Sequence, residues 1–355
     1  MSENSFFSGA VFLFLCLNIF CFKTLLRKLK TFSATFPCKL RQIVYKFYDM
    51  KKLTYLAFSI FSILTFAQEV QKERIETVLS TLASDEMKGR EIGTPENDNA
   101  ANYIAKLFKE NNLEYCTGNS YLVPFEYKGK TAYNVCGMKK GKTGKFLGFS
   151  GHFDHIGTSN NPNDSIYNGA DDDASGITTL VGIADYFKNK KPDFSMVFIA
   201  FNGEEKGMLG SRAISTDKNL DKIYNNMTAL FNFEMVATES AFGKNALFMT
   251  GDQFSDLDEL VNKNAANGLK INPDPYAAQQ LFYRSDNVSF VKKKIIAHSF
   301  STVDMTKATH YHNESDDVHI VDFDNLTQII NNFGKTLERL SPSNFNPKYN
   351  DTVKF

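Results

Sequence analysis

The 355-residue sequence has little cysteine, no net charge and none of the short motifs that mark several common enzyme classes. Five cysteines are too few for a disulfide-built scaffold of this length. The 40 basic residues balance 40 acidic ones, so the overall charge gives no reason to expect a nucleic-acid partner. HExxH, G-x-S-x-G and a glycine-rich phosphate loop are all absent, which removes the usual signals of zincins, α/β-hydrolases and nucleotide-binding enzymes. A hydrophobic content of 43% and a charged content of 23% are ordinary for a globular protein and argue against disorder.

The neutral total is the sum of two parts of opposite charge. Residues 1–67 contain nine Lys and Arg against two Asp and Glu, so residues 68–355 carry a formal charge of −7. The first part also contains two apolar runs, at 6–22 and 53–66. The two parts therefore need separate interpretations.

The second apolar run lies within the three-part pattern of a secretory signal peptide. A basic start, Met50-Lys51-Lys52, precedes the apolar residues, and small residues precede the expected cleavage site before Gln68. The run is shorter than the roughly 20 apolar residues that span a bilayer comfortably. We therefore predict that 50–67 is a signal peptide and that the rest of the chain is exported, to the periplasm or the medium.

Residues 1–49 have two interpretations. They are an artefact of the assigned gene start if translation begins at Met50, which is the simpler interpretation because a signal peptide needs no hydrophobic segment before it. Alternatively, they are a membrane anchor whose basic flank lies in the cytoplasm. In that case this segment is the chain's expected contact with a membrane.

Two of the five cysteines, Cys116 and Cys136, lie in the part that is predicted to be exported. In an exported protein these two side chains could form a disulfide. The alternative is a pair of buried free thiols, and the sequence leaves both open.

Residues 68–355 have the alternating pattern of a single α/β domain. Helical patterns occur at 69–84, 97–111, 174–188, 254–266 and 322–340. Short apolar runs that we expect to be strands occur at 133–138, 145–150, 194–201, 229–233, 246–249 and 295–300. Because strands separated by helices of this length form crossover units, we expect a mainly parallel, twisted central sheet that is covered by helices on both faces.

Histidine and acidic residues stand at the ends of three predicted strands. His152 follows one strand, the pair Glu204-Glu205 follows another, and Glu234 ends a third. The carboxyl edge of an open parallel sheet is where ligand sites form. An aspartate triplet at 171–173, just before a predicted helix, adds three more carboxylates. We therefore expect a cluster of carboxylates and imidazoles at this edge.

Such a cluster needs positive charge to hold it together. Several carboxylates on one edge repel one another unless something neutralises them, as divalent cations do. Imidazole combined with carboxylate suits zinc, and two histidines with three acids are enough for two metals that share a bridging carboxylate. Two such metals can activate one water and polarise a carbonyl. Adjacent glutamates at a strand end point in different directions, so one can ligate a metal while the other acts as general base.

Five motifs occur in this order along the chain: Gly89-Arg90-Glu91-x-Gly93-Thr94-Pro95, His152-x-Asp154, Gly169-Ala170-Asp171-Asp172-Asp173-Ala174-Ser175-Gly176, Glu204-Glu205-x-Gly207-x-x-Gly210-Ser211 and His312-x-x-x-Asp316. Together they resemble the co-catalytic zinc aminopeptidases, a family that also includes glutamate carboxypeptidases and glutaminyl cyclases. The resemblance extends over about residues 75–340. It implies that 68–355 is one zinc-peptidase catalytic domain.

The resemblance also implies the metal ligands. His152 would bind one zinc, and Asp172 would bridge this zinc to a second one. Glu205 and His312 would complete the second zinc. Glu234 stands where the family usually has an aspartate ligand to the first zinc, so the ligand here is longer by one methylene.

Further roles follow from the same resemblance. Glu204 would be the general base and later the acid, and Asp154 would fix the imidazole of His152. Tyr283 is our candidate for a phenol that stabilises the tetrahedral oxyanion, with Tyr311 as its rival. The remaining histidines are predicted to be structural or exposed rather than ligands: His155, His298, His310 and His319.

The sequence therefore predicts an exported enzyme with about two zinc ions per chain. Its expected activity is that of an aminopeptidase acting on peptides with a free N-terminus. The main alternative is a single-zinc acyltransferase like the glutaminyl cyclases. A carboxypeptidase for acidic dipeptides is less favoured because the exported part has few arginines, and a non-catalytic binding module is less favoured because the ligand set is intact.

Overall fold

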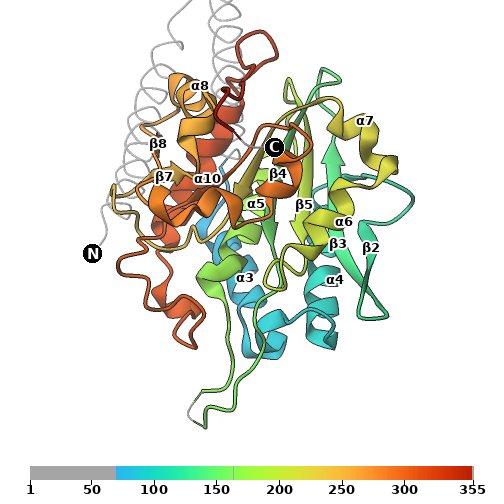
Figure 1. The fold of residues 1–355 in the computed structure, drawn as a ribbon, viewed down its shortest axis with the longest axis vertical. Coiled ribbons are helices and arrows are strands. Elements are labelled where there is room, and N and C mark those ends of the chain that lie inside the picture. Colours follow the sequence, from blue (N-terminus) through green and yellow to red (C-terminus); the bar gives the residue numbers. More distant parts are fainter. Residues whose placement is uncertain (1–68, 163, 354–355) are drawn as a thin grey trace, which may run out of the picture. The chain divides into compact units, whose positions relative to one another are not determined.

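The computed structural model describes residues 69–162 and 164–353, so the predicted leader at 1–49 and signal peptide at 50–67 lie outside the described residues. A nine-stranded sheet runs through the described part in the order β1-β3-β5-β4-β6-β9-β7-β8, with β2 paired to β3 (Figure 1). The strands are β1 (Glu114–Tyr115), β2 (Leu122–Tyr127), β3 (Lys130–Lys139), β4 (Phe146–His152), β5 (Ser195–Phe201), β6 (Met227–Phe233), β7 (Ala246–Met249), β8 (Lys270–Asn272) and β9 (Ala297–Ser301).

The four central strands, β5, β4, β6 and β9, are parallel, as the sequence predicts. The antiparallel pairs lie towards the edges, where β3 pairs with β5 and β7 pairs with β9. At one edge, the β2–β3 hairpin turns through Lys128 and Gly129, which both have positive φ. Cys116 is joined to Cys136 by a disulfide, which ties the segment after β1 to β3.

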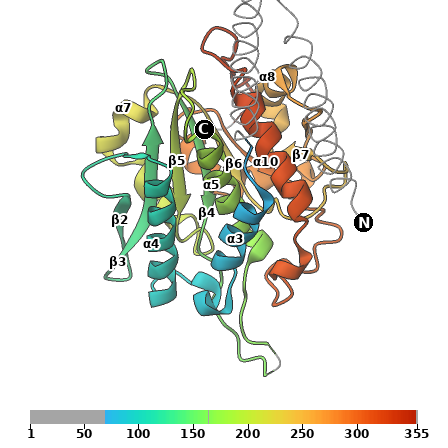
Figure 2. The same ribbon diagram turned by 180° about the vertical axis from the view of Figure 1, so that it is seen from behind.

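Helices cover both faces of the sheet. The helices α3, α4, α5 and α10 lie on one face (Figure 2), and residues of α6, α7 and α9 belong to the apolar cluster of the other face. The helices are α3 (Lys72–Leu82), α4 (Pro95–Glu110), α5 (Ser175–Phe187), α6 (Leu209–Ser215), α7 (Asp221–Tyr224), α8 (Leu257–Asn264), α9 (Asn287–Val291) and α10 (Phe323–Leu337). This arrangement confirms the predicted α/β class. Within the described residues, none of these helices combines the length and apolarity that crossing a membrane requires.

Strand β5 shows why the central sheet is stable. All seven of its residues are buried, because alternate side chains point into the two apolar clusters on opposite faces. Met196, Phe198 and Ala200 belong to one cluster, and Val197, Ile199 and Phe201 belong to the other. Burial of a large apolar side chain contributes about 1.5–3 kcal/mol. Such a strand holds the residues that follow it rigidly in place.

Candidate metal centre

The predicted carboxyl edge brings the expected residues together. Strand β4 lies between β5 and β6, and all three run in the same direction. Their ends therefore deliver His152, the Glu204-Glu205 pair and Glu234 to one side of the sheet. Asp172 joins them from a short irregular turn, Ala170–Ala174, that leads into α5.

Asp172 lies between two histidines, and each of its oxygens faces a different one. His152 Nε2 is 3.2 Å from Asp172 Oδ1, and His312 Nε2 is 3.3 Å from Asp172 Oδ2. His312 Nε2 is also 3.0 Å from Glu205 Oε2. Ligand atoms at ~2.0–2.1 Å from a tetrahedral zinc stand about 3.3 Å apart. The spacing therefore fits a carboxylate that bridges two metals.

The contact between His152 and Asp172 supports this interpretation further. His152 Nε2 is buried and makes no hydrogen bond within the described residues, although an oxygen of Asp172 lies nearby. A buried polar nitrogen without a hydrogen bond costs free energy unless something else binds it. Zinc is a natural partner for an imidazole nitrogen beside a carboxylate.

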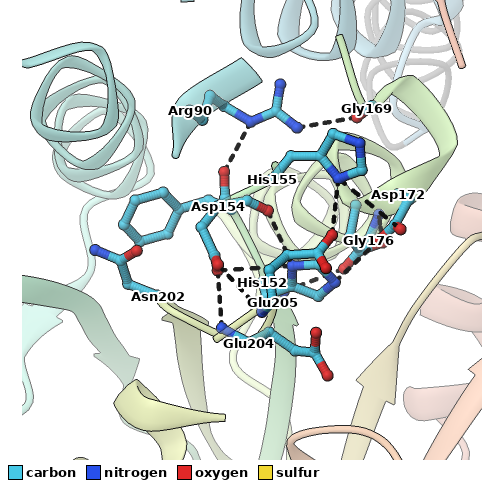
Figure 3. Close-up of polar contacts among 12 residues, drawn as sticks. Arg90, His152, Asp154, His155, Gly169, Asp172, Gly176, Asn202, Glu204 and Glu205 are labelled. Atoms are coloured by element: carbon cyan, nitrogen blue, oxygen red, sulfur yellow. Dashed lines mark hydrogen bonds and ion pairs between the residues drawn. The ribbon is translucent and has the colours of Figure 1, made fainter. Parts of the chain in front are cut away.

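Glu204 and Glu234 line the same cavity as Asp172 and His312. Figure 3 shows the Glu204 side chain directed away from that of Glu205, as adjacent residues after a strand should be. Burial raises the pKa of Glu204 well above its ordinary value, against the opposing charge of His152. Burial also raises the pKa of Glu234 to about 7. The site is therefore short of positive charge, and divalent cations would supply it.

Asp154 lies beside the imidazole of His152 and also contacts the turn that follows β5. His152 Nδ1 donates to the main-chain oxygen of Asp154, at 3.1 Å, and lies 3.7 Å from the carboxylate oxygen Oδ1 of the same residue. The Asp154 carboxylate accepts the backbone N–H groups of Glu204, at 3.1 Å, and Glu205, at 3.3 Å. Asp154 thus fixes the turn that carries the glutamate pair, which the spacing of the motifs did not reveal.

The neighbours of Asp172 hold the turn in place. Asp316 accepts the backbone N–H groups of Asp171, at 2.7 Å, and Asp172, at 3.0 Å. His310 Nε2 lies 2.9 Å from Asp171 Oδ2, so the loop that carries His312 is linked twice to this turn. These contacts give Asp171 and Asp316 supporting roles at the turn.

Arg90 has a structural role that its motif alone did not indicate. Its guanidinium is fully buried and donates to the main-chain oxygens of four residues: Leu82, Phe153, Asn168 and Gly169. Burial lowers its pKa to about 10, which leaves it charged at neutral pH. Arg90 therefore ties the segment after β4 to the turn before α5 (Figure 3).

The two candidate tyrosines lie in different environments. Tyr283 packs against Phe282 and Phe254, with ring centroids 5.0 and 5.9 Å away, and does not line the cavity. Tyr311 lines the cavity and stacks on His312 at 4.0 Å. Burial, together with the nearby carboxylates, raises the pKa of Tyr311 and keeps its hydroxyl protonated. The structure thus places the rival residue, and not Tyr283, beside the candidate metal ligand His312.

The remaining histidines divide into two groups. His298 is buried between Ser255 and the carbonyl of Thr250, and His319 is exposed, as expected for structural and surface residues. His155 differs, because it is buried with Nδ1 2.9 Å from Glu205 Oε1 (Figure 3). His155, Asp172 and Glu205 each offer a ligand atom, and these atoms lie within 4.8 Å of one another.

Solved structures of known proteins share this fold. A zinc aminopeptidase from Bacillus subtilis matches with a TM-score of 0.61 at 15% identity, over 78% of this chain and 97% of its own. A glutaminyl cyclase from Bacteroides thetaiotaomicron matches with a TM-score of 0.61 at 17% identity, over 77% of this chain and 99% of its own. At these identities the similarity establishes the fold alone.

The sequence comparisons give the family. A vacuolar membrane protease from Schizosaccharomyces pombe is 26% identical over 165 residues, which is 46% of this chain and 17% of the longer relative. The chain thus matches less than a fifth of that relative's length. Residues 134–337, more than half of the chain, match the family model of Peptidase family M28. The chain therefore belongs to peptidase family M28, in agreement with the resemblance of its motifs.

Proposed function

We propose that this member of peptidase family M28 is an exported zinc aminopeptidase that holds two zinc ions. The observation that carries the proposal is the position of Asp172, whose two oxygens face the nitrogens of two different histidines. One ion would be held by His152, Asp172 and Glu234, and the other by Asp172, Glu205 and His312. Bound zinc supplies the means to lower the pKa of a water and to polarise a substrate carbonyl.

Glu204 is the group that moves protons. It lines the cavity, its side chain is directed away from Glu205, and its pKa is raised by burial. A raised pKa suits a carboxylate that must both accept and return a proton near neutral pH. We assign to Glu204 the removal of a proton from the attacking water and its delivery to the nitrogen of the leaving amine.

The cavity favours an N-terminal residue with an apolar side chain. The free α-ammonium group of a peptide is a cation, and the carboxylates of Glu204 and Glu234 would attract it. The cavity is also lined by apolar side chains: Met235, Phe248, Leu281, Val303 and Met305. An apolar pocket binds a side chain mainly because apolar surface of both is buried. This favours apolar side chains of about the size of leucine or methionine.

The function is tested by comparing substrates that differ only at one end. We expect hydrolysis of leucyl and methionyl peptides, and no release of the first residue when the same peptides are N-acetylated. Peptides with an amidated C-terminus should be cleaved as well as the free acids. Cleavage that requires a free C-terminus would instead support the carboxypeptidase alternative, and no cleavage of any peptide would contradict both.

A glutaminyl cyclase activity is the second candidate, because a protein of similar fold has that name. The geometry favours the hydrolase, because His152 and Glu234 offer ligand atoms in addition to those of Asp172, Glu205 and His312, which would suffice for one zinc. Conversion of an N-terminal glutamine to a ring, with one zinc per chain, would support the cyclase instead. Metal content measured together with products on a glutaminyl peptide distinguishes the two.

Export is part of the proposal and rests on two features. Residues 50–67 have the pattern of a signal peptide. The disulfide between Cys116 and Cys136 is a bond that persists in oxidising compartments such as the periplasm or the medium.

Tyr311 is the proposed donor to the oxyanion that forms when water attacks the carbonyl. Replacing Tyr311 with phenylalanine should lower kcat by about 10²–10³-fold, because one preorganised donor is lost where negative charge develops. Tyr283→Phe is the matched control, and its kcat should stay near that of the unmodified enzyme because Tyr283 packs away from the cavity. Steady-state kinetics on one leucyl substrate would check both variants, and the opposite ranking would return the role to Tyr283.

A further inference from the structure

We infer that His155 is a positioning residue of the metal centre, which holds one oxygen of Glu205 so that the other faces the metal. The inference rests on the proposed function only in taking Glu205 as a zinc ligand. His155 is fully buried, and its Nδ1 lies 2.9 Å from Glu205 Oε1. None of the chemical steps above uses this imidazole.

The two oxygens of Glu205 have different partners. Oε1 is beside His155 Nδ1, whereas Oε2 is 3.0 Å from His312 Nε2. A carboxylate that is fixed at both oxygens has a single orientation, so little rotamer freedom is lost when a metal binds. Without the contact to His155, Glu205 could rotate, and only His312 would define its position.

Within the described residues, Glu205 is the only acceptor within hydrogen-bond distance of His155 Nδ1. Nδ1 is 3.9 Å from Asp172 Oδ2, which is too far for a hydrogen bond. The other nitrogen, Nε2, is buried and has no hydrogen-bond partner within the described residues. A proton on Nε2 would be a buried donor without an acceptor, which costs about 1–3 kcal/mol. The favoured tautomer therefore carries its proton on Nδ1 and donates it to the carboxylate.

The imidazole ring is also held in place. Gly169 has a φ of +59°, and a Cβ atom at this position would stand 2.7 Å from Cγ and Cδ2 of His155. The ring therefore packs directly on the backbone of Gly169. The carbonyl of Gly169 in turn accepts a hydrogen bond from Arg90. The buried arginine thus fixes the surface on which His155 rests.

Two adjacent residues after β4, Asp154 and His155, both hold Glu205 in place. The Asp154 carboxylate accepts the backbone N–H of Glu205, and the imidazole of His155 holds the side chain (Figure 3). The backbone and the carboxylate of this ligand are therefore both set by the segment that directly follows His152. This arrangement gives a reason for a histidine, rather than a small polar residue, at position 155.

The test compares a substitution that keeps a donor at the position of Nδ1 with one that does not. In His155→Asn, the amide nitrogen stands at the same number of bonds from the backbone as Nδ1, whereas His155→Leu has a similar bulk and no donor. Zinc affinity and zinc per chain are measured by competition with a chromogenic chelator. We expect His155→Leu to weaken one of the zinc sites by about 10–100-fold and His155→Asn to restore most of that loss. His319→Leu, a change of an exposed histidine, should alter neither site.

Two outcomes would overturn the inference. If His155→Asn and His155→Leu lose the same zinc to the same extent, the imidazole is itself a ligand. If both bind zinc like the unmodified protein, His155 has no role at the centre. Circular dichroism of the metal-free variants shows whether they fold, so that a folding defect is separated from a loss of zinc. Because zinc binding is read directly, a failure of the peptide-cleavage assay would contradict the proposed function and leave this test intact.

Discussion

Replacing Glu204 with glutamine should lower kcat by about 10²–10⁴-fold while leaving the zinc content unchanged. The amide has nearly the shape of the carboxylate, so the cavity keeps its form, but it cannot accept a proton from water or return one to the amine. Glu204 has no ion pair to any of the described histidines, whereas Glu205 lies beside two of them. Steady-state kinetics on a leucyl peptide, with zinc measured on the same sample, would check this expectation.

The adjacent residue provides a matched control for this prediction. Glu205→Gln makes the same chemical change one position further along, at a residue that contacts His312 and His155. It should lose zinc as well as activity, because a neutral amide is a poor ligand where a carboxylate is needed. If Glu204→Gln also loses zinc, or keeps near-normal turnover, then Glu204 is not the group that moves the proton.

Much of the sheet is predictable from local patterns. All six predicted strands correspond to observed strands, because buried parallel strands are short, continuous apolar runs, as β5 and β6 show. All five predicted helices are also present, although 254–266 shortens to α8, Leu257–Asn264, after a separate turn at Asp252–Phe254.

The elements that the sequence did not reveal are short or lie at an edge. Strand β2 contains Pro124, which cannot donate to a central ladder and argues against a strand unless the strand is at an edge. β2 is such a strand, because it pairs with β3 alone. Helices α6, α7 and α9 have only four to seven residues, which is too short for a helical period to be recognised.

The arrangement of the candidate site could likewise be predicted from the sequence only in part. Residues at the ends of parallel strands must meet at one edge, so the grouping of His152, Glu204 and Glu234 follows from the strand positions. Contacts between separate loops do not follow from such positions. The hydrogen bond between His155 and Glu205, and the place of Tyr311 rather than Tyr283 in the cavity, depend on side-chain directions that no spacing encodes.

Replacing Asp172 with asparagine should remove both zinc ions and abolish hydrolysis. The two oxygens of Asp172 face different histidines, so an asparagine can offer an acceptor to one side at most and presents an amide nitrogen to the other. Glu234 lines the same cavity, and in the proposed arrangement it would hold only one of the two ions. Loss of a ligand to one ion should leave the other ion bound, whereas loss of the bridging carboxylate of Asp172 should release both.

Thermal unfolding with and without zinc gives the sharpest measurement of this effect. A ligand that binds only the folded protein stabilises it by about 2.7 kcal/mol at a concentration 100 times its Kd, so the unmodified protein should show a clear rise in Tm on addition of zinc. Asp172→Asn should show no such rise, while Asp98→Asn, on the exposed side of α4, should respond like the unmodified protein. The comparison is a difference between two conditions for each variant, so any change in the stability of the zinc-free protein cancels. If Asp172→Asn keeps one zinc with unchanged affinity, the carboxylate belongs to a single ion, and the two-metal centre must be built from other residues.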